Sequence, residues 1–218
     1  MTGTAGELRI VELRQYTLRP GRRDELIGLF EREFVESQEE AGIRLLGLFR
    51  DLERPDRFVW LRGFPDMEAR AESLAAFYER HEAWKRHGPA ANATMIDSDD
   101  VLLLRPVTGD LAREGARPSG DGEGDGDGVI GLTVNGFRDA EELDTHVRAF
   151  TPRTGAPRTG TPPLATLRTE PAANSYPRLP VREGEHVFVR LARYPDEAAC
   201  RAHGPTLVLA PTARSALR

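Results

Sequence analysis

The chain has 218 residues and a formal net charge of −5, with 39% hydrophobic and 30% charged residues, a balance typical of a folded protein and not of a disordered one. Its basic residues are spread along the chain, so we expect neither nucleic acid nor an anionic membrane as a partner. The single cysteine, Cys200, excludes an intrachain disulfide and a cysteine-based zinc cluster, and without a secretory leader or an apolar run of about 20 residues we expect a cytoplasmic protein.

The first predicted elements are a strand and a helix. Residues 8–18 alternate and are rich in β-formers, which predicts a strand that Pro20 and Gly21 end in a turn. Residues 22–41 are predicted to be helical, with Gly42 ending the helix because glycine accepts a positive φ. The apolar stripe of this helix consists of Leu26, Ile27, Phe30 and Phe34.

Two strands, a second helix and a last strand complete the first half. Residues 45–50 and 57–64 have the pattern of strands, and residues 100–105 form the last one. Asp66 can cap a helix that Gly88 is expected to stop. The order βαββαβ is that of a ferredoxin-like domain, in which two helices cover one face of the sheet and the other face stays open.

A glycine- and aspartate-rich segment, residues 109–128, separates two halves of similar size. It has one large apolar side chain, so burial cannot offset the entropy of ordering it. We therefore predict three parts: a ferredoxin-like domain at 1–108, a flexible linker at 109–128 that can largely be deleted without loss of stability, and a second ferredoxin-like domain at 129–218.

The second half repeats landmarks of the first. Residues 58–66 recur as 188–196, an apolar strand that ends in aromatic-Pro-Asp both times, and His87-Gly88-Pro89 recurs as His203-Gly204-Pro205. The predicted elements of this half lie at residues 129–134, 140–150, 164–169, 186–192, 196–203 and 207–209. Since strand 57–64 is apolar on both faces, we predict an α+β fold in which the two sheets pack as a barrel within one chain; a homodimer of whole chains is a further expectation.

Several motif matches are rejected on spacing. Residues 126–131 match G-x-G-x-x-G but precede a strand, whereas a dinucleotide site needs this loop to open a helix. A calcium loop starting at Asp121 would have Leu132 where a bidentate Glu is required. His81 and His87 lie six residues apart, on different sides of a regular helix. We therefore predict no metal and no bound cofactor.

The strongest candidate site is a cluster of aromatic, histidine and arginine residues. Period two places Trp60 and Arg62 on one face of their strand, where an arginine beside an indole suits a partly polar pocket. His81 is the candidate acid or base because imidazole titrates near neutrality, and Arg14 and Arg62 would hold an oxyanion. The residues expected to bind a planar, aromatic substrate are Tyr16, Trp60, Tyr78, Trp84 and His87. The alternative is that the aromatic rings are core and the arginines pair with carboxylates.

Four segments resemble bacterial members of the NIPSNAP family. They are residues 12–21 (ELRQYTLRPG), 58–66 (FVWLRGFPD), 92–99 (NATMIDSD) and 174–185 (NSYPRLPVREGE). The resemblance implies membership of the dimeric α/β-barrel group, which also holds antibiotic-biosynthesis monooxygenases, polyketide cyclases and haem-degrading enzymes, and a pocket between sheet and helices.

Two functions follow from this resemblance as expectations. The first is a small-molecule enzyme that oxygenates, isomerises or cyclises an aromatic or polyketide-like compound without a cofactor, with a place in secondary metabolism. The alternative is a non-catalytic ligand-binding or scaffold protein that uses the same pocket. The fold alone does not separate them, because one fold hosts many chemistries.

Overall fold

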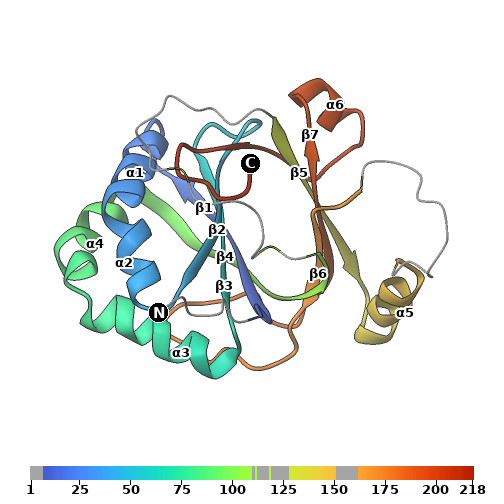
Figure 1. The fold of residues 1–218 in the computed structure, drawn as a ribbon, viewed down its shortest axis with the longest axis horizontal. Helices are drawn as coiled ribbons and strands as arrows, with labels where there is room; N and C mark the ends of the chain where they lie inside the picture. The colour runs from blue at the N-terminus through green and yellow to red at the C-terminus, as the bar shows by residue number, and fades with distance from the viewer. Residues whose placement is uncertain (1–6, 110, 112–117, 119–127, 151–161) are drawn as a thin grey trace.

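The computed structural model describes residues 7–109, 111, 118, 128–150 and 162–218 (Figure 1). The first half contains the strands β1 (Ile10–Leu18), β2 (Arg44–Asp51), β3 (Arg57–Phe64) and β4 (Met95–Thr108), and the helices α1 (Arg23–Leu29), α2 (Val35–Glu40), α3 (Met67–Ala75) and α4 (Glu82–Thr94). One π-helical turn joins α1 to α2 and another follows α3, at Phe30–Phe34 and Ala76–Arg80. The predicted order βαββαβ is confirmed.

The second half repeats this order with shorter helices. Its elements are β5 (Val129–Phe137), α5 (Ala140–Phe150), β6 (Ala165–Thr169), β7 (His186–Tyr194), α6 (Glu197–Arg201) and β8 (Leu207–Pro211). Asp66 and Asp196, one in each half, cap α3 and α6 by accepting a hydrogen bond from the backbone N–H three residues on. Most of the linker predicted at 109–128 lies outside the described residues, but Leu111 is buried with the core.

The second helix differs from its prediction at two points. It does not stop at Gly88 but runs to Thr94. Gly88 lies inside the helix, where the ring of Trp84 packs in the space that a side chain at residue 88 would occupy. The helix breaks instead at His81, whose backbone is extended and whose Nδ1 accepts a hydrogen bond from the Ala83 N–H at 3.2 Å. β4 also begins earlier than predicted, because residues 95–97 pair with the end of β1 through bulges.

The eight strands close into one barrel, in the order β1-β3-β2-β8-β5-β7-β6-β4. Within each half this is the ferredoxin-like order, and two seams join the halves: β2 to β8, where Phe49 pairs with Pro211, and β4 to β6, where Leu104 pairs with Thr169. The predicted pairing of the two halves within one chain is confirmed. A protein tether makes this encounter intramolecular, which favours it over pairing between chains.

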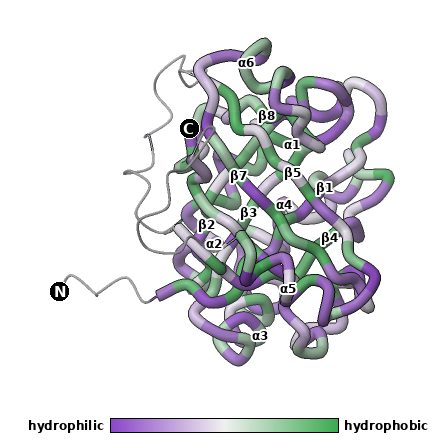
Figure 2. Tube along the Cα trace, turned by 90° about the vertical axis from the view of Figure 1, so that its right-hand side faces the viewer, coloured by the Kyte–Doolittle hydropathy of each residue, from purple (hydrophilic) through white to green (hydrophobic). Residues whose placement is uncertain are grey.

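Strand alternation divides the apolar residues between two cores. On β3, Val59 and Leu61 point into the barrel, while Phe58, Trp60 and Phe64 point outward beneath the helices. Side chains of both halves fill the interior, as is usual for eight strands. Helices α1 to α4 cover the outer face of the first half, while α5 and α6 lie on the other side of the molecule (Figure 1). Hydrophobic and hydrophilic residues alternate along the chain trace (Figure 2).

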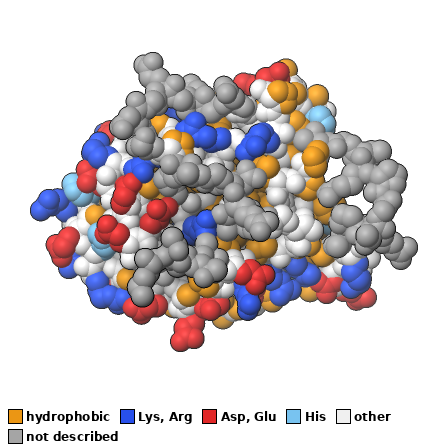
Figure 3. Space-filling view, viewed as in Figure 1, with side chains coloured by type: hydrophobic (Ala, Val, Ile, Leu, Met, Phe, Trp, Pro, Cys, Tyr) orange, Lys and Arg blue, Asp and Glu red, His pale blue; other side chains and the backbone are white. Residues whose placement is uncertain are grey.

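The surface carries charges of both signs. In the view of Figure 3, acidic and basic side chains intermingle over the helices of the first half. Among the described residues, no helix is long and apolar enough to cross a membrane.

Candidate functional site

A cavity of about 150 Å³ lies between the outer face of the first sheet and its helices. Its walls are mainly aromatic, since Tyr16 on β1 and Trp60 on β3 face Phe77 and Trp84 on the helices. The ring centroids of Tyr16 and Trp60 lie 5.7 Å apart, edge to face. The remaining lining residues are Arg14, Leu26, Phe30, Phe34, Gln38, Tyr78, Ala91, Asn92, Met95, Ser98 and Leu179.

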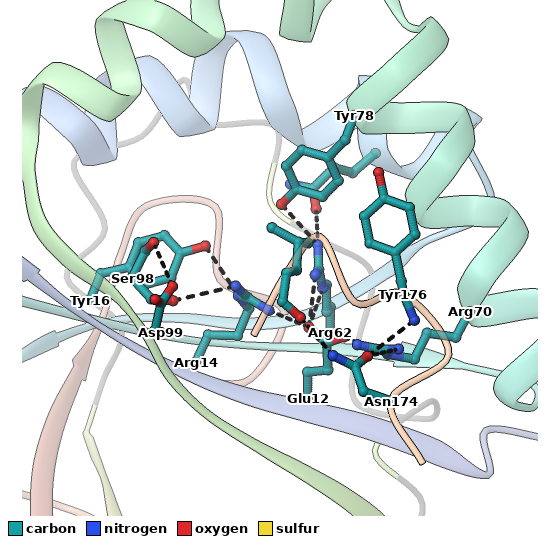
Figure 4. Close-up of polar contacts among 12 residues, drawn as sticks. Glu12, Arg14, Tyr16, Arg62, Arg70, Tyr78, Ser98, Asp99, Asn174 and Tyr176 are labelled. Atoms are coloured by element: carbon teal, nitrogen blue, oxygen red, sulfur yellow. Dashed lines mark hydrogen bonds and ion pairs between the residues drawn. The ribbon is translucent and has the colours of Figure 1, made fainter. Parts of the chain in front are cut away.

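Beneath the cavity lies an ion cluster that we define as Glu12, Arg14, Arg62 and Arg70, all with at most 1% of the residue exposed (Figure 4). Glu12 Oε2 accepts from Arg14 Nη1 and from Arg62 Nε, both at 2.7 Å. Glu12 Oε1 accepts from Arg70 Nε at 2.7 Å. One carboxylate therefore orients three guanidinium groups that come from two strands and a helix.

Mutual charge favours the ionised forms of Glu12 and Arg14. Burial alone would raise the pKa of Glu12, but Arg62, Arg14 and Arg70 together hold that pKa well below its usual range. Burial opposes the charge of Arg14, yet the neighbouring groups, Glu12 among them, raise its pKa. Glu12 is thus an anchor for the arginines and not a base.

Arg14 is the member of the ion cluster that reaches the cavity. Its Nε donates to the hydroxyl of Tyr16 at 3.1 Å, and its Nη2 has only a long contact, 3.5 Å, with the carbonyl of Ser98. The Tyr16 hydroxyl accepts from Arg14, so its own proton is free for a ligand. Burial raises the pKa of Tyr16, with partial opposition from Arg14, so that this hydroxyl remains a donor at neutral pH.

A segment of the second half, residues 170–185, completes the site; we call it the covering segment. Leu179 of this segment lines the cavity. Arg70 Nη1 donates to Asn174 Oδ1 at 3.0 Å, and Asn174 Nδ2 donates to the Leu179 carbonyl at 2.9 Å. Tyr176 donates its hydroxyl hydrogen to Glu79 at 2.9 Å, and burial together with this bond raises the pKa of Tyr176 to about 12. The ion cluster thus holds the covering segment in place.

The structure brings most of the predicted site residues together. Of these, Arg14, Tyr16, Trp60, Tyr78 and Trp84 line the cavity. Arg62 lies just below it, donating to the hydroxyl of Tyr78 at 3.2 Å. The two histidines lie elsewhere: His81 Nε2 is 3.3 Å from Glu40 and His87 Nε2 is 3.4 Å from Glu33, with about a quarter of each imidazole exposed.

Sequence reasoning missed Glu12, Arg70 and the covering segment. Glu12 could have been found, because it shares one face of β1 with Arg14 and Tyr16 at period two. Arg70 lies on a helix without a recognisable motif, and the covering segment comes from the other half, so no local signal connects either of them to the cavity.

The described residues of the second half contain no copy of this site. In the sequence repeat, Ala192 occupies the position of Arg62. Arg62 pairs with Glu12 across the sheet, and Ala192 pairs with Gly131. Gly131 is therefore the counterpart of Glu12 in the second half. A Cβ on Gly131 would lie 2.6 Å from the Tyr194 ring and 2.9 Å from Cys200 Sγ. Tyr194 and Cys200 therefore fill the space, and burial raises the pKa of the Cys200 thiol.

A second cavity, of about 510 Å³, lies between α5, β6 and the covering segment. It is larger, and two of its arginines pair with carboxylates: Arg168 with Asp144, and Arg182 with Asp100 and Glu185. Its described lining residues lack the aromatic side chains of the smaller cavity. The smaller cavity is the better candidate because it combines aromatic walls with an arginine that has spare donors. Among the described residues, no group of three or more His, Cys, Asp or Glu side chains could hold a metal ion.

The family model that matches this chain is NIPSNAP, over residues 11–108. Residues 11–108 form a NIPSNAP-family domain. The match therefore covers β1 to β4 with their helices, and with them the ion cluster and every cavity residue except Leu179. A comparison with curated proteins found no match.

Solved structures resemble the NIPSNAP domain or the whole chain. A NIPSNAP-like domain protein from Burkholderia xenovorans is 29% identical, over 46% of this chain and 86% of that one, with a TM-score of 0.42. A NIPSNAP family protein from Agrobacterium tumefaciens is 24% identical, over 44% and 91%, with a TM-score of 0.41. A candidate monooxygenase from Lactobacillus acidophilus is 13% identical but covers 94% of both chains, with a TM-score of 0.52, and so shares the two-half fold.

Proposed function

We propose that this chain is a small-molecule enzyme of the dimeric α/β-barrel type, which oxygenates, isomerises or cyclises an aromatic or polyketide-like compound without a bound cofactor, as part of secondary metabolism. The observation that supports this is the cavity above Arg14, in which aromatic walls surround a few converging polar groups, as in small-ligand sites generally. The Lactobacillus acidophilus protein shares this fold, which agrees with the proposal, but the similarity supports the fold alone and not a reaction.

Arg14 and Tyr16 supply the chemistry in this proposal. Both can donate hydrogen bonds to an enolate or phenolate oxygen, and they are held in place before the substrate arrives, which is how fixed donors lower a barrier. Such a substrate can supply its own electrons: a CH₂ group becomes C=O, one oxygen atom of O₂ enters the product and the other leaves as water. Isomerisation and cyclisation use the same stabilised enolate.

A second candidate function is ligand binding without catalysis. The observation that favours it is the lining of the cavity, since none of the described lining residues is a His, Asp, Glu, Lys or Cys that could accept a proton near neutral pH. His81 as acid or base stays a prediction, and a His81→Gln variant tests it. If His81 acts, the variant loses turnover.

The experiment measures oxygen uptake and products with single-ring phenols and 1,3-diketones as probes, using an oxygen electrode and mass spectrometry. We expect product formation that falls by about a hundredfold or more in Arg14→Gln, the order of magnitude lost when one oxyanion donor is removed. Arg138→Gln, which removes the same charge from an exposed ion pair of the second half, is the matched control. Saturable binding of a probe with neither oxygen uptake nor rearranged product would establish the second candidate instead.

A further inference from the structure

The charge of the ion cluster is not balanced. Three buried arginines face one buried glutamate, which leaves two positive charges, and Glu12 is the only carboxylate that pairs with them in the part of the chain that the structure describes. A buried charge without a counter-ion is costly, so native proteins pair it. The cavity above Arg14 is the open space next to this excess charge.

Donor groups at the same place lack acceptors. Trp60 lines the cavity, and its buried indole N–H has no hydrogen-bond partner. Arg14 Nη2 has only the 3.5 Å contact with Ser98, and the Tyr16 hydroxyl proton is uncommitted because that oxygen already accepts from Arg14. Buried donors are normally satisfied, so three incompletely used donors around one cavity call for an acceptor.

The size of the cavity limits the ligand. An apolar protein cavity of about 150 Å³ holds benzene, and the volume here is about 150 Å³. Leu179 of the covering segment closes one side, so a fused ring system would have to displace it.

We infer that the cavity takes a single-ring organic anion, whose ring packs among Tyr16, Trp60 and Trp84 and whose oxyanion pairs with Arg14. This inference depends on one part of the proposed function, namely that the cavity binds a small molecule. The anion supplies the missing counter-charge, and the ring replaces water against the aromatic walls. Polyketide-like compounds with fused rings would fit this cavity only if Leu179 moved.

The two tryptophans of the chain, Trp60 and Trp84, both line the cavity, so intrinsic tryptophan fluorescence reports on this site alone. The probes are benzoate, its neutral isostere benzamide, and 2-naphthoate, titrated into the full chain. We expect a saturable change with benzoate at one site per chain, roughly tenfold or more weaker binding of benzamide because a charged hydrogen bond is lost, and no binding of 2-naphthoate at the same concentrations.

Variants test whether Arg14 is the partner of the anion. In Arg14→Gln, benzoate should bind as weakly as benzamide, whereas Arg14→Lys should keep a preference for benzoate and Arg138→Gln should match the wild type. If Arg14→Gln does not fold, the comparison of benzoate with benzamide in the wild type decides the question. Equal affinity for the two probes overturns the inference while leaving a small-molecule site, and binding of neither probe overturns the site itself.

Discussion

Arg70 and Asn174 are joined by a hydrogen bond of 3.0 Å, from Nη1 to Oδ1, across the two halves of the chain. The same asparagine holds the carbonyl of Leu179 at 2.9 Å. A buried charge of the first half therefore fixes the position of an apolar side chain of the second half over the cavity. The polar and aromatic side chains of the site come from the first half, and Leu179 of the second half completes the wall of the cavity.

Removing Asn174 should loosen the cavity without changing its charge. We expect Asn174→Ala to weaken benzoate binding severalfold and to admit 2-naphthoate, because the carbonyl of Leu179 loses its hydrogen bond from Asn174 and Leu179 can move more easily. Tryptophan fluorescence titration measures both effects. Asn135→Ala, at the exposed position of β5 equivalent to Tyr16, is the control and should behave as wild type. Unchanged selectivity in Asn174→Ala would mean that Leu179 does not set the size limit.

The unbalanced charge predicts an order of stabilities. Glu12→Gln removes the only carboxylate of the ion cluster and should cost about 3–5 kcal/mol, the usual loss when a buried ion pair is broken. Arg70→Met should cost less, because it reduces the excess positive charge from two to one. Urea denaturation of both variants gives the comparison. The reverse order would show that the cluster does not carry excess positive charge.

The pH dependence of stability should expose the same carboxylate. The pKa of Glu12 is lowered in the folded protein, so its stabilisation is complete above the unfolded-state pKa of about 4.3 and is lost as the pH falls toward the folded value. We expect the stability difference between wild type and Glu12→Gln to be constant from about pH 6 to 8 and to shrink steadily below about pH 4.3. A difference that grows on acidification would contradict this assignment.

Two glycines should respond to alanine in opposite directions. Gly28 lies on an exposed face of α1 with nothing near its missing Cβ, so Gly28→Ala should stabilise by about 0.5–1 kcal/mol. At Gly47 on β2, a Cβ would lie 2.4 Å from the Phe49 ring, so Gly47→Ala should destabilise by about 1–3 kcal/mol. Thermal unfolding of the pair measures both, and a shift of the same sign in both variants would count against this packing.

The first half should not remain a monomer by itself. Residues 1–108 alone would expose the barrel-facing residues Val59 and Leu61 and two unpaired strand edges, β2 and β4. We expect a homodimer or an aggregate in light scattering after size-exclusion chromatography. A stable, soluble monomer would show that the barrel interior needs no partner.

The sequence by itself determined the elements and the order in which they pair. Alternation on β3, the cap at Asp66, and the repeat of residues 58–66 at 188–196 are local signals, because strand period and helix capping act over a few residues. They were enough to predict two ferredoxin-like halves joined as a barrel. They also placed Trp60 and Arg62 on one face.

Only the tertiary structure decided which of the candidate residues meet. The break at His81 turns the imidazole to Glu40 and away from the cavity, which the helical pattern of residues 67–94 does not reveal. Glu12, Arg70 and Asn174 are brought together from positions up to 162 residues apart. Contacts of this kind depend on the closure of the barrel, which places the covering segment of one half over the helices of the other, and no periodicity within a strand or helix encodes that placement.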